Sequence, residues 1–216
     1  MIIFCTFHPA SVLDGGWHLE SYIREDFKRF SQKQLRPPIK KLPRASTDVI
    51  GFDTEYSPDG SLLTVGLSDT QRACAIELTE HGSRKRIASI VKRAKYLVGH
   101  SVDGDLDYLV KLKLAKESWL KGINVKDSFL LARMADENKG RGGYGLEPLL
   151  LSHFNFKEWK TETAALLKKT GNAMDWTPAQ RTERCRLDSW ATLILANKLY
   201  PVVLRKGQDV AKVRLT

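Results

Sequence analysis

Two acidic residues, Asp53 and Glu55, lie two positions apart in the otherwise apolar segment VIGFDTEYS. In a β-strand, residues two positions apart point to the same face, so the two carboxylates are expected to lie side by side. Placing like charges together without a cation is costly, because desolvation and mutual repulsion both disfavour the ionised forms. The pattern predicts a cation site on a central strand, and the alternative is a solvent-facing edge strand.

A second acidic group, Asp103, Asp105 and Asp107, follows the apolar run YLVG. Helix capping is the alternative explanation for these aspartates, since capping is common. A third acid, Asp188, lies in RCRLDSWATLILANKLY, where apolar residues recur at helical spacing. Taken alone, Asp188 is an ordinary helical acid, but its apolar neighbours indicate that its turn of helix faces the core, where an unpaired carboxylate is expensive.

The elements that must position these acids are expected to be strands first and helices later. Residues 48–68 are expected to form two strands joined by a turn at Pro58-Asp59-Gly60, and residues 73–78 a third strand, which gives an antiparallel meander. The remaining pattern predicts a basic helix at 84–95, a strand at 96–99, helices at 104–112 and around Phe129, a strand at 123–125, a loop at 138–145, and helices after Leu146. This order indicates an α/β domain with a mixed sheet flanked by helices.

Three segments differ in composition. Residues 1–30 are typical of a strand and an amphipathic helix, which are too short to bury a core alone. Residues 31–47, SQKQLRPPIKKLPRAST, combine prolines with basic residues and contain no acid, which is typical of a linker. Residues 48–216 are expected to form the main domain.

The composition favours a polyanionic partner. The chain has 216 residues, with 35 Lys and Arg against 25 Asp and Glu, a formal net charge of +10. This charge suits the phosphates of nucleic acid, and the alternative is a basic surface kept for solubility. The apolar stretches are too short for a membrane span, the amino terminus does not resemble a secretory signal, and three widely spaced cysteines give no disulfide framework. We expect a cytoplasmic location.

The order of the acidic motifs resembles the DEDD superfamily of 3′-to-5′ exonucleases, which includes proofreading domains of DNA polymerase I type, RNase D and the Werner exonuclease. The resemblance rests on DTE at residues 53–55, on GHSVDGD at residues 99–105, and on the helical Asp188. The segments DSFLLAR and GYGLEPLL are also similar to the polymerase I and RNase D families. The match spans about residues 48–203 and implies a ribonuclease H-like fold.

The resemblance implies hydrolysis with two divalent metal ions. Asp53, Glu55, Asp105 and Asp188 would hold Mg²⁺ or Mn²⁺, which prefer hard oxygen ligands. Two such ions can activate a water and stabilise the leaving 3′ oxygen. Asp103 and Asp107 do not match ligand positions of the family and are expected to be solvated or to cap the helix.

One position departs from the family pattern. Families of this kind carry a Tyr four residues before the last Asp, or a His five before it, and these groups orient or deprotonate the attacking water. Here the positions hold Arg184 and Glu183. Arginine cannot act as a base, although it could hold a phosphate, whereas Glu183 could accept a proton. We expect metal binding to be retained and activity to be reduced, with a silent site as the alternative.

Five further residues are candidates for contacting the nucleic acid. The rings of Tyr56 and Tyr108 could stack on a frayed terminal base. Lys139 and Arg141 lie in a glycine-rich loop and could contact phosphates, although a solvated loop is equally consistent with the sequence. His100 ends a buried strand and could contact a nucleotide, and the alternative is a hydrogen-bonded core residue.

A second, shorter resemblance lies at the amino terminus. The segment IFCTFHPASVL and the charged helix after it are similar to the last motif of uracil-DNA glycosylases. The earlier catalytic motifs of those enzymes are absent, so residues 1–30 are interpreted as a glycosylase-like remnant, and no base excision is expected. The alternative is an unrelated strand and helix that packs on the main domain.

Together these observations predict a two-metal 3′-to-5′ exonuclease acting on 3′ ends of single-stranded DNA. Because no polymerase motif is present, proofreading beside a separate polymerase I-type chain is the expected setting, in a phage or its bacterial host. The alternatives are a catalytically silent, nuclease-like binding subunit and an RNase D-like exoribonuclease.

Overall fold

The fold is built on one six-stranded mixed sheet with the strand order β1-β4-β3-β2-β5-β6. The computed structural model describes residues 37–57, 59–121, 124–137, 143–154, 156 and 176–207, so the predictions for residues 1–30, Lys139 and Arg141 lie outside the described residues. The strands are β1 (Ile39–Lys40), β2 (Val49–Tyr56), β3 (Leu62–Ser68), β4 (Arg72–Glu77), β5 (Tyr96–Gly99) and β6 (Val125–Asp127).

Strands β2, β3 and β4 form the predicted antiparallel meander. Strand β5 pairs parallel to β2, and β6 pairs parallel to β5, so β2 lies inside the sheet. Side chains alternate along β2: Ile50 and Phe52 enter the core on one face, and Gly51 and Asp53 face the other. The predicted central strand is therefore confirmed, and the edge-strand alternative is wrong.

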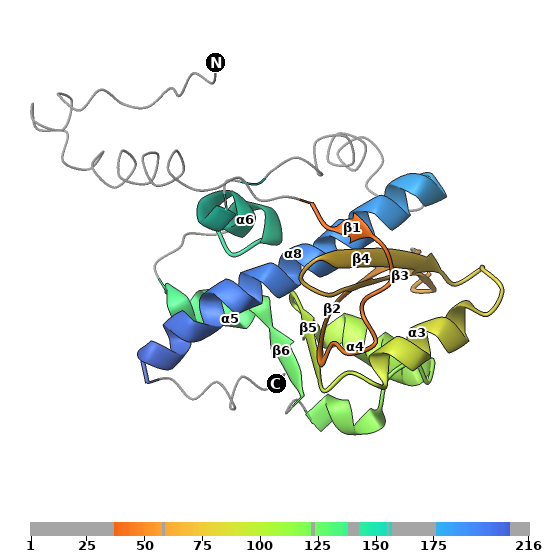
Figure 1. Ribbon diagram of the computed structural model, residues 1–216, viewed down its shortest axis with the longest axis horizontal. Coiled ribbons are helices and arrows are strands. Elements are labelled where there is room, and N and C mark those ends of the chain that lie inside the picture. The colour runs from red at the N-terminus through yellow and green to blue at the C-terminus, as the bar shows by residue number, and fades with distance from the viewer. Residues whose placement is uncertain are drawn as a thin grey trace, which may run out of the picture.

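Helices cover both faces of the sheet (Figure 1). The buried side chains of α3 and α4 belong to the core that contains Ile50 and Phe52, and those of α5, α6 and α8 form a second core. The predicted α/β class, a mixed sheet flanked by helices, is confirmed. The helices are α3 (Ser83–Val91), α4 (Asp103–Lys111), the 3-10 helix η2 (Glu117–Lys121), α5 (Ser128–Ala135), α6 (Leu146–Phe154) and α8 (Pro178–Arg205).

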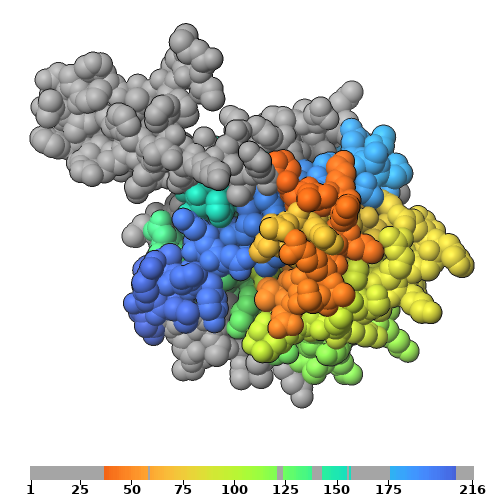
Figure 2. All heavy atoms as spheres, viewed as in Figure 1, coloured from red at the N-terminus to blue at the C-terminus, as the bar shows by residue number. Residues whose placement is uncertain are grey.

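Two differences from the sequence prediction have local causes. Helix α3 ends at Val91 rather than at residue 95, because the amides of Lys95 and Tyr96 both donate to the carbonyl of Asp48 and so begin β5. Within residues 31–47, Ile39–Lys40 pairs parallel to β4 as a short edge strand. In Figure 2 the segment that begins at residue 37 lies on the surface between α8 and α3.

Helix α8 begins at a well-defined cap and then crosses the meander. The Thr177 hydroxyl accepts from the amide of Gln180, whose side chain accepts from the amide of Thr177, and Pro178 occupies the first turn. Further along the helix, the carbonyl of Ser189 accepts a 2.9 Å hydrogen bond from the Ser68 hydroxyl on β3. These contacts fix the register of α8 against the sheet and therefore the position of its acidic residue.

Two glycines permit the close approach of α8. A Cβ atom added at Gly51 would lie 2.3 Å from the carbonyl oxygen of Ser189, and one added at Gly66 would lie 2.1 Å from that of Cys185. Both distances are far below van der Waals contact, and both neighbours are helix backbone. The sheet face beneath α8 must therefore lack side chains at these positions.

The substitution Gly66→Ala is expected to destabilise the protein by about 3 kcal/mol, because α8 must shift to admit the new methyl group. Urea unfolding followed by circular dichroism measures the change. Gly104→Ala is the matched control, since nothing lies within 4 Å of a Cβ added in α4 and alanine favours a helix. Equal stability of the two variants would contradict the close packing of α8.

None of the helices in the described part of the chain is both long enough and apolar enough to span a membrane.

Candidate metal centre

Three carboxylates meet between β2 and α8. Asp53, Glu55 and Asp188 each offer an oxygen, and among the described residues these three oxygens lie within 4.8 Å of one another. The two strand residues face the helix because they alternate with the core residues of β2. Asp188 is only 6 % exposed, which confirms that its turn of α8 faces the core. We call these three residues the carboxylate trio.

A cation of the chain itself touches the carboxylate trio. The Nε atom of Arg184 lies 3.5 Å from Oε1 of Glu55 and 3.6 Å from Oδ2 of Asp188. The guanidinium also lies over the ring of Trp176, 4.7 Å from its centroid. Arg184 lies one helical turn before Asp188, so both side chains are on the same face of α8, as their spacing in the sequence implies.

Asp105 approaches β2 from the opposite face. It lies in the first turn of α4, and its Oδ1 accepts hydrogen bonds from the hydroxyls of Thr54 and Tyr56, the latter at 2.7 Å. These two hydroxyls alternate with Asp53 and Glu55 along the strand. The structure therefore gathers three of the four predicted ligands in the carboxylate trio and places Asp105 next to them, across β2.

The electrostatics of the site favour a bound cation. Burial of the Asp53 carboxyl, followed by the charges of Asp188, Glu55 and Asp105, raises the pKa of Asp53 well above its ordinary value. Burial also raises the pKa of Asp105, although hydrogen bonds from the two neighbouring hydroxyls oppose the shift. A divalent cation relieves such repulsion, and carboxylate oxygens are the donors that Mg²⁺ and Mn²⁺ prefer. The residues present therefore fit these ions.

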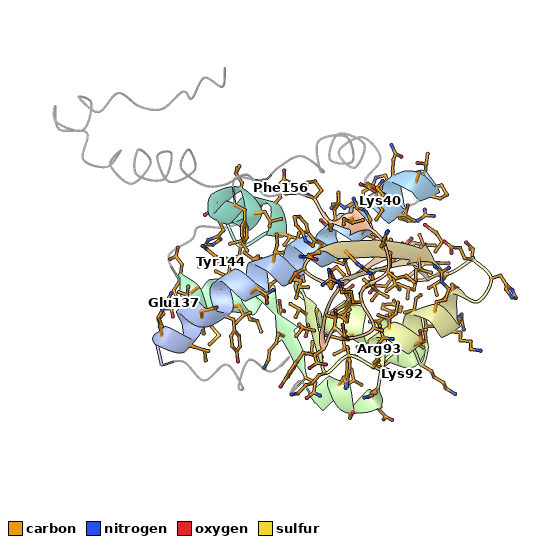
Figure 3. The ribbon with its side chains drawn as sticks, in the orientation of Figure 1. Lys40, Lys92, Arg93, Glu137, Tyr144 and Phe156 are labelled. Atoms are coloured by element: carbon orange, nitrogen blue, oxygen red, sulfur yellow. The ribbon has the colours of Figure 1, made fainter. Side chains whose placement is uncertain are left out.

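Glu183 lies outside the carboxylate trio. Its carboxylate accepts from Arg186 at 2.6 and 3.1 Å and pairs with Lys40 at 2.9 Å. Figure 3 shows Lys40 beside the N-terminal half of α8. Burial acts to raise the pKa of Glu183, but the hydrogen bonds from Arg186 and Lys40 outweigh it and lower the pKa. A carboxylate held in this way is a poor proton acceptor.

The candidate nucleic-acid residues have neighbours of their own. The ring of Tyr56 packs on that of Tyr108 with centroids 4.6 Å apart, next to Asp105. Nδ1 of His100 lies 2.8 Å from the Ser128 hydroxyl, and its ring packs edge-on against Phe129. These contacts favour the hydrogen-bonded core alternative for His100, and a contact of any of these residues with nucleic acid stays a prediction.

The sequence analysis did not predict the role of Asp127, which holds the turn before α4 in place. The buried carboxylate of Asp127 caps α5 through the amide of Phe129 and also accepts from the amides of Ser101 and Val102. Those two amides belong to the turn that leads into α4 and so to Asp105. An Asp-Ser pair before an apolar helix is a known capping signal and could have identified Asp127.

No protein-family model and no curated protein sequence matches the chain. The predicted glycosylase-like character of residues 1–30 therefore finds no support. Solved structures do show similarity. The crystal structure of Escherichia coli RNase D, an exoribonuclease involved in structured RNA processing, superposes with a TM-score of 0.53 at 19% sequence identity.

The match to RNase D covers 76% of this chain and 41% of RNase D, so the chain spans less than half the length of that protein. The EXD2 exonuclease domain also matches, in crystals soaked in Mn and dGMP, with 18% identity over 92% of this chain and 93% of that chain. Its TM-score of 0.32 is too low to support an argument. The α/β fold of this chain is similar to that of RNase D, which agrees with the predicted ribonuclease H-like fold.

Proposed function

We propose that this protein is a metal-dependent exonuclease that removes nucleotides from the 3′ ends of nucleic acid. The observation that carries the proposal is the carboxylate trio of Asp53, Glu55 and Asp188, gathered by β2 and α8 within 4.8 Å. The fold shared with an exoribonuclease supports it. The net charge of +10 suits a polyanionic substrate.

In this proposal the acidic residues hold two divalent ions. Asp53, Glu55 and Asp188 are the first three ligands in this proposal. Asp105, which lies on the α4 side of β2, is the fourth. Bound Mg²⁺ or Mn²⁺ supplies a water of lowered pKa and stabilises the leaving 3′ oxygen. Gly51 on the ligand-bearing strand β2 and Gly66 on the neighbouring strand β3 let α8 pack closely on the sheet, which keeps the ligands in place.

We propose single-stranded DNA as the substrate, trimmed beside a separate polymerase I-type chain in a proofreading role. RNA is the second candidate, favoured by the fold shared with RNase D. A catalytically silent binding subunit is the third candidate, and the contact of Arg184 with the carboxylate trio favours it. Arg184 occupies the position at which DEDD exonucleases carry a Tyr that orients or deprotonates the attacking water.

The test is degradation of 5′-labelled single-stranded DNA and RNA of identical sequence on denaturing gels, with Mn²⁺, Mg²⁺ or a chelator. A ladder that shortens from the 3′ end only with metal supports the exonuclease, and the faster strand identifies the sugar. If both strands stay intact at high protein concentration but are bound in a gel-shift assay, the protein is a binding subunit. Cleavage that persists in the chelator would contradict a metal-dependent site.

A further inference from the structure

Arg184 is held in the candidate metal centre by contacts that differ from those of its neighbour on the same helix. Its ion pairs to Glu55 and Asp188 measure 3.5 and 3.6 Å, longer than a charge-assisted hydrogen bond. Arg181, one turn earlier, makes two 3.1 Å hydrogen bonds to Glu77. At its Nε atom, Arg184 is therefore attracted to Glu55 and Asp188 by charge rather than by a close hydrogen bond.

Trp176 holds the charge of Arg184 at this place by a different interaction. The guanidinium lies 4.7 Å from the centroid of the indole ring, and Trp176 itself is 4% exposed. A cation over an indole face is stabilised independently of any carboxylate. Trp176 therefore stabilises the positive charge of Arg184 whether or not Glu55 and Asp188 are its partners.

Arg184 and a divalent ion compete for the same carboxylates. Glu55 and Asp188 are two of the three members of the carboxylate trio, and Arg184 touches both. A bound divalent cation uses these carboxylates as ligands and repels a guanidinium a few ångströms away, since the side chain of Arg184 is only 16% exposed and little water screens it. Glu55 and Asp188 therefore cannot fully neutralise Arg184 and a divalent ion at the same time.

We infer that Arg184 is an exchangeable counter-ion of the metal centre: it pairs with Glu55 and Asp188 when no ion is bound, and it holds the phosphate of the substrate when one is. The inference rests on the proposed nuclease function. When the metal binds Glu55 and Asp188, the phosphodiester becomes the new negatively charged partner of the guanidinium. The planar guanidinium can donate hydrogen bonds to two phosphate oxygens at once. Arg184 is then a phosphate-positioning residue rather than a substitute for a base.

The first test measures metal binding without any nucleic acid. Isothermal titration of the full chain with MnCl₂ is compared for the wild type, Arg184→Gln, Arg184→Lys and the control Lys198→Gln, which removes an exposed positive charge from the same helix. Arg184→Gln is expected to bind Mn²⁺ about tenfold more tightly, since the competing charge is gone. Arg184→Lys keeps the charge and should stay near the wild type, as should the control.

The second test measures phosphate binding with Mn²⁺ at saturation. A deoxynucleoside monophosphate is titrated into the same four proteins. Arg184→Gln is expected to bind it about tenfold more weakly than the wild type, and Arg184→Lys to lie between them, because lysine keeps the charge but not the two-pronged geometry. The control should match the wild type.

The outcomes separate this inference from the proposed function. If the wild type cleaves 3′ ends with Mn²⁺ but Arg184→Gln binds Mn²⁺ no more tightly, or binds the nucleotide equally well, Arg184 is a structural ion pair and only the inference is overturned. If the wild type binds no Mn²⁺ at all, both are overturned. Circular dichroism of Arg184→Gln with Mn²⁺ verifies folding, and Arg184→Lys provides the charge-retaining comparison.

Discussion

Replacing Asp53 by asparagine is expected to lower the rate of 3′-end cleavage by about a thousandfold or more, because Asp53 lies at the centre of the acidic cluster and a neutral amide is a weak ligand for Mg²⁺. The charges of Asp188, Glu55 and Asp105 all act on Asp53. The rate is read from single-turnover degradation of the labelled strand. Asp48→Asn, an exposed acid immediately before the same strand, is the matched control.

The same substitution should stabilise the protein in a chelator. Burial raises the pKa of Asp53 in the folded protein well above its ordinary value, so the unfolded chain ionises first as the pH rises. Stability contributed by this group is present below about pH 4 and is lost as the pH rises through the folded pKa. At neutral pH Asp53→Asn removes that penalty, and its melting temperature in chelator should exceed that of the wild type.

Mn²⁺ should reverse this order. A ligand that binds only the folded state stabilises it by about 2.7 kcal/mol at a hundredfold excess over its Kd. The wild type is expected to gain thermal stability with Mn²⁺, and Asp53→Asn should gain little. A variant that is less stable than the wild type in chelator as well would mean that Asp53 is structural, and the loss of cleavage would then say nothing about metal binding.

Parts of this site could be predicted from the sequence because they depend on local periodicity. The alternation along VIGFDTEYS places Asp53 and Glu55 on one face, and the apolar neighbours of Asp188 turn it toward the core. The contact of Asp105 with Thr54 and Tyr56 could not be predicted in this way, since it joins a helix to the other face of the strand. Such a contact depends on where α4 packs.

Two further features depend on long-range geometry. The pairing of Ile39–Lys40 with β4 adds a strand inside a proline-rich, basic segment, where composition predicts a linker. The stacking of Arg184 on Trp176 joins two residues eight positions apart, across the start of α8. Helical spacing relates Arg184 to Asp188, but no periodicity relates it to a residue that precedes the helix.

Arg181 and Glu77 form the buried ion pair that fastens α8 to the meander, and breaking it is the second change with a large expected effect. Nε and Nη2 of Arg181 each donate at 3.1 Å to Glu77, and the Thr64 hydroxyl donates to the same carboxylate at 2.8 Å. Thr64 lies opposite both Glu77 on β4 and Glu55 on β2. The pair therefore anchors the helix directly beside the carboxylate trio.

Arg181→Met is expected to cost about 3 to 5 kcal/mol, because Glu77 is left as an uncompensated buried charge. The double variant Arg181→Met with Glu77→Leu should recover most of that loss, since it removes both charges. Arg86→Met is the control: it breaks an exposed 3.0 Å pair with Glu80 and should cost less than about 1 kcal/mol. Urea unfolding of the four proteins measures these differences.

The double variant also separates anchoring from chemistry. If the pair serves only to hold α8, restoring stability without the ions should restore Mn²⁺ affinity as well, because Asp188 returns to the side of Asp53 and Glu55. If the double variant is stable but still binds Mn²⁺ weakly, the directional hydrogen bonds of the ion pair are needed to position Asp188. Apolar packing at the same place would then be insufficient, since the ligand position tolerates little displacement.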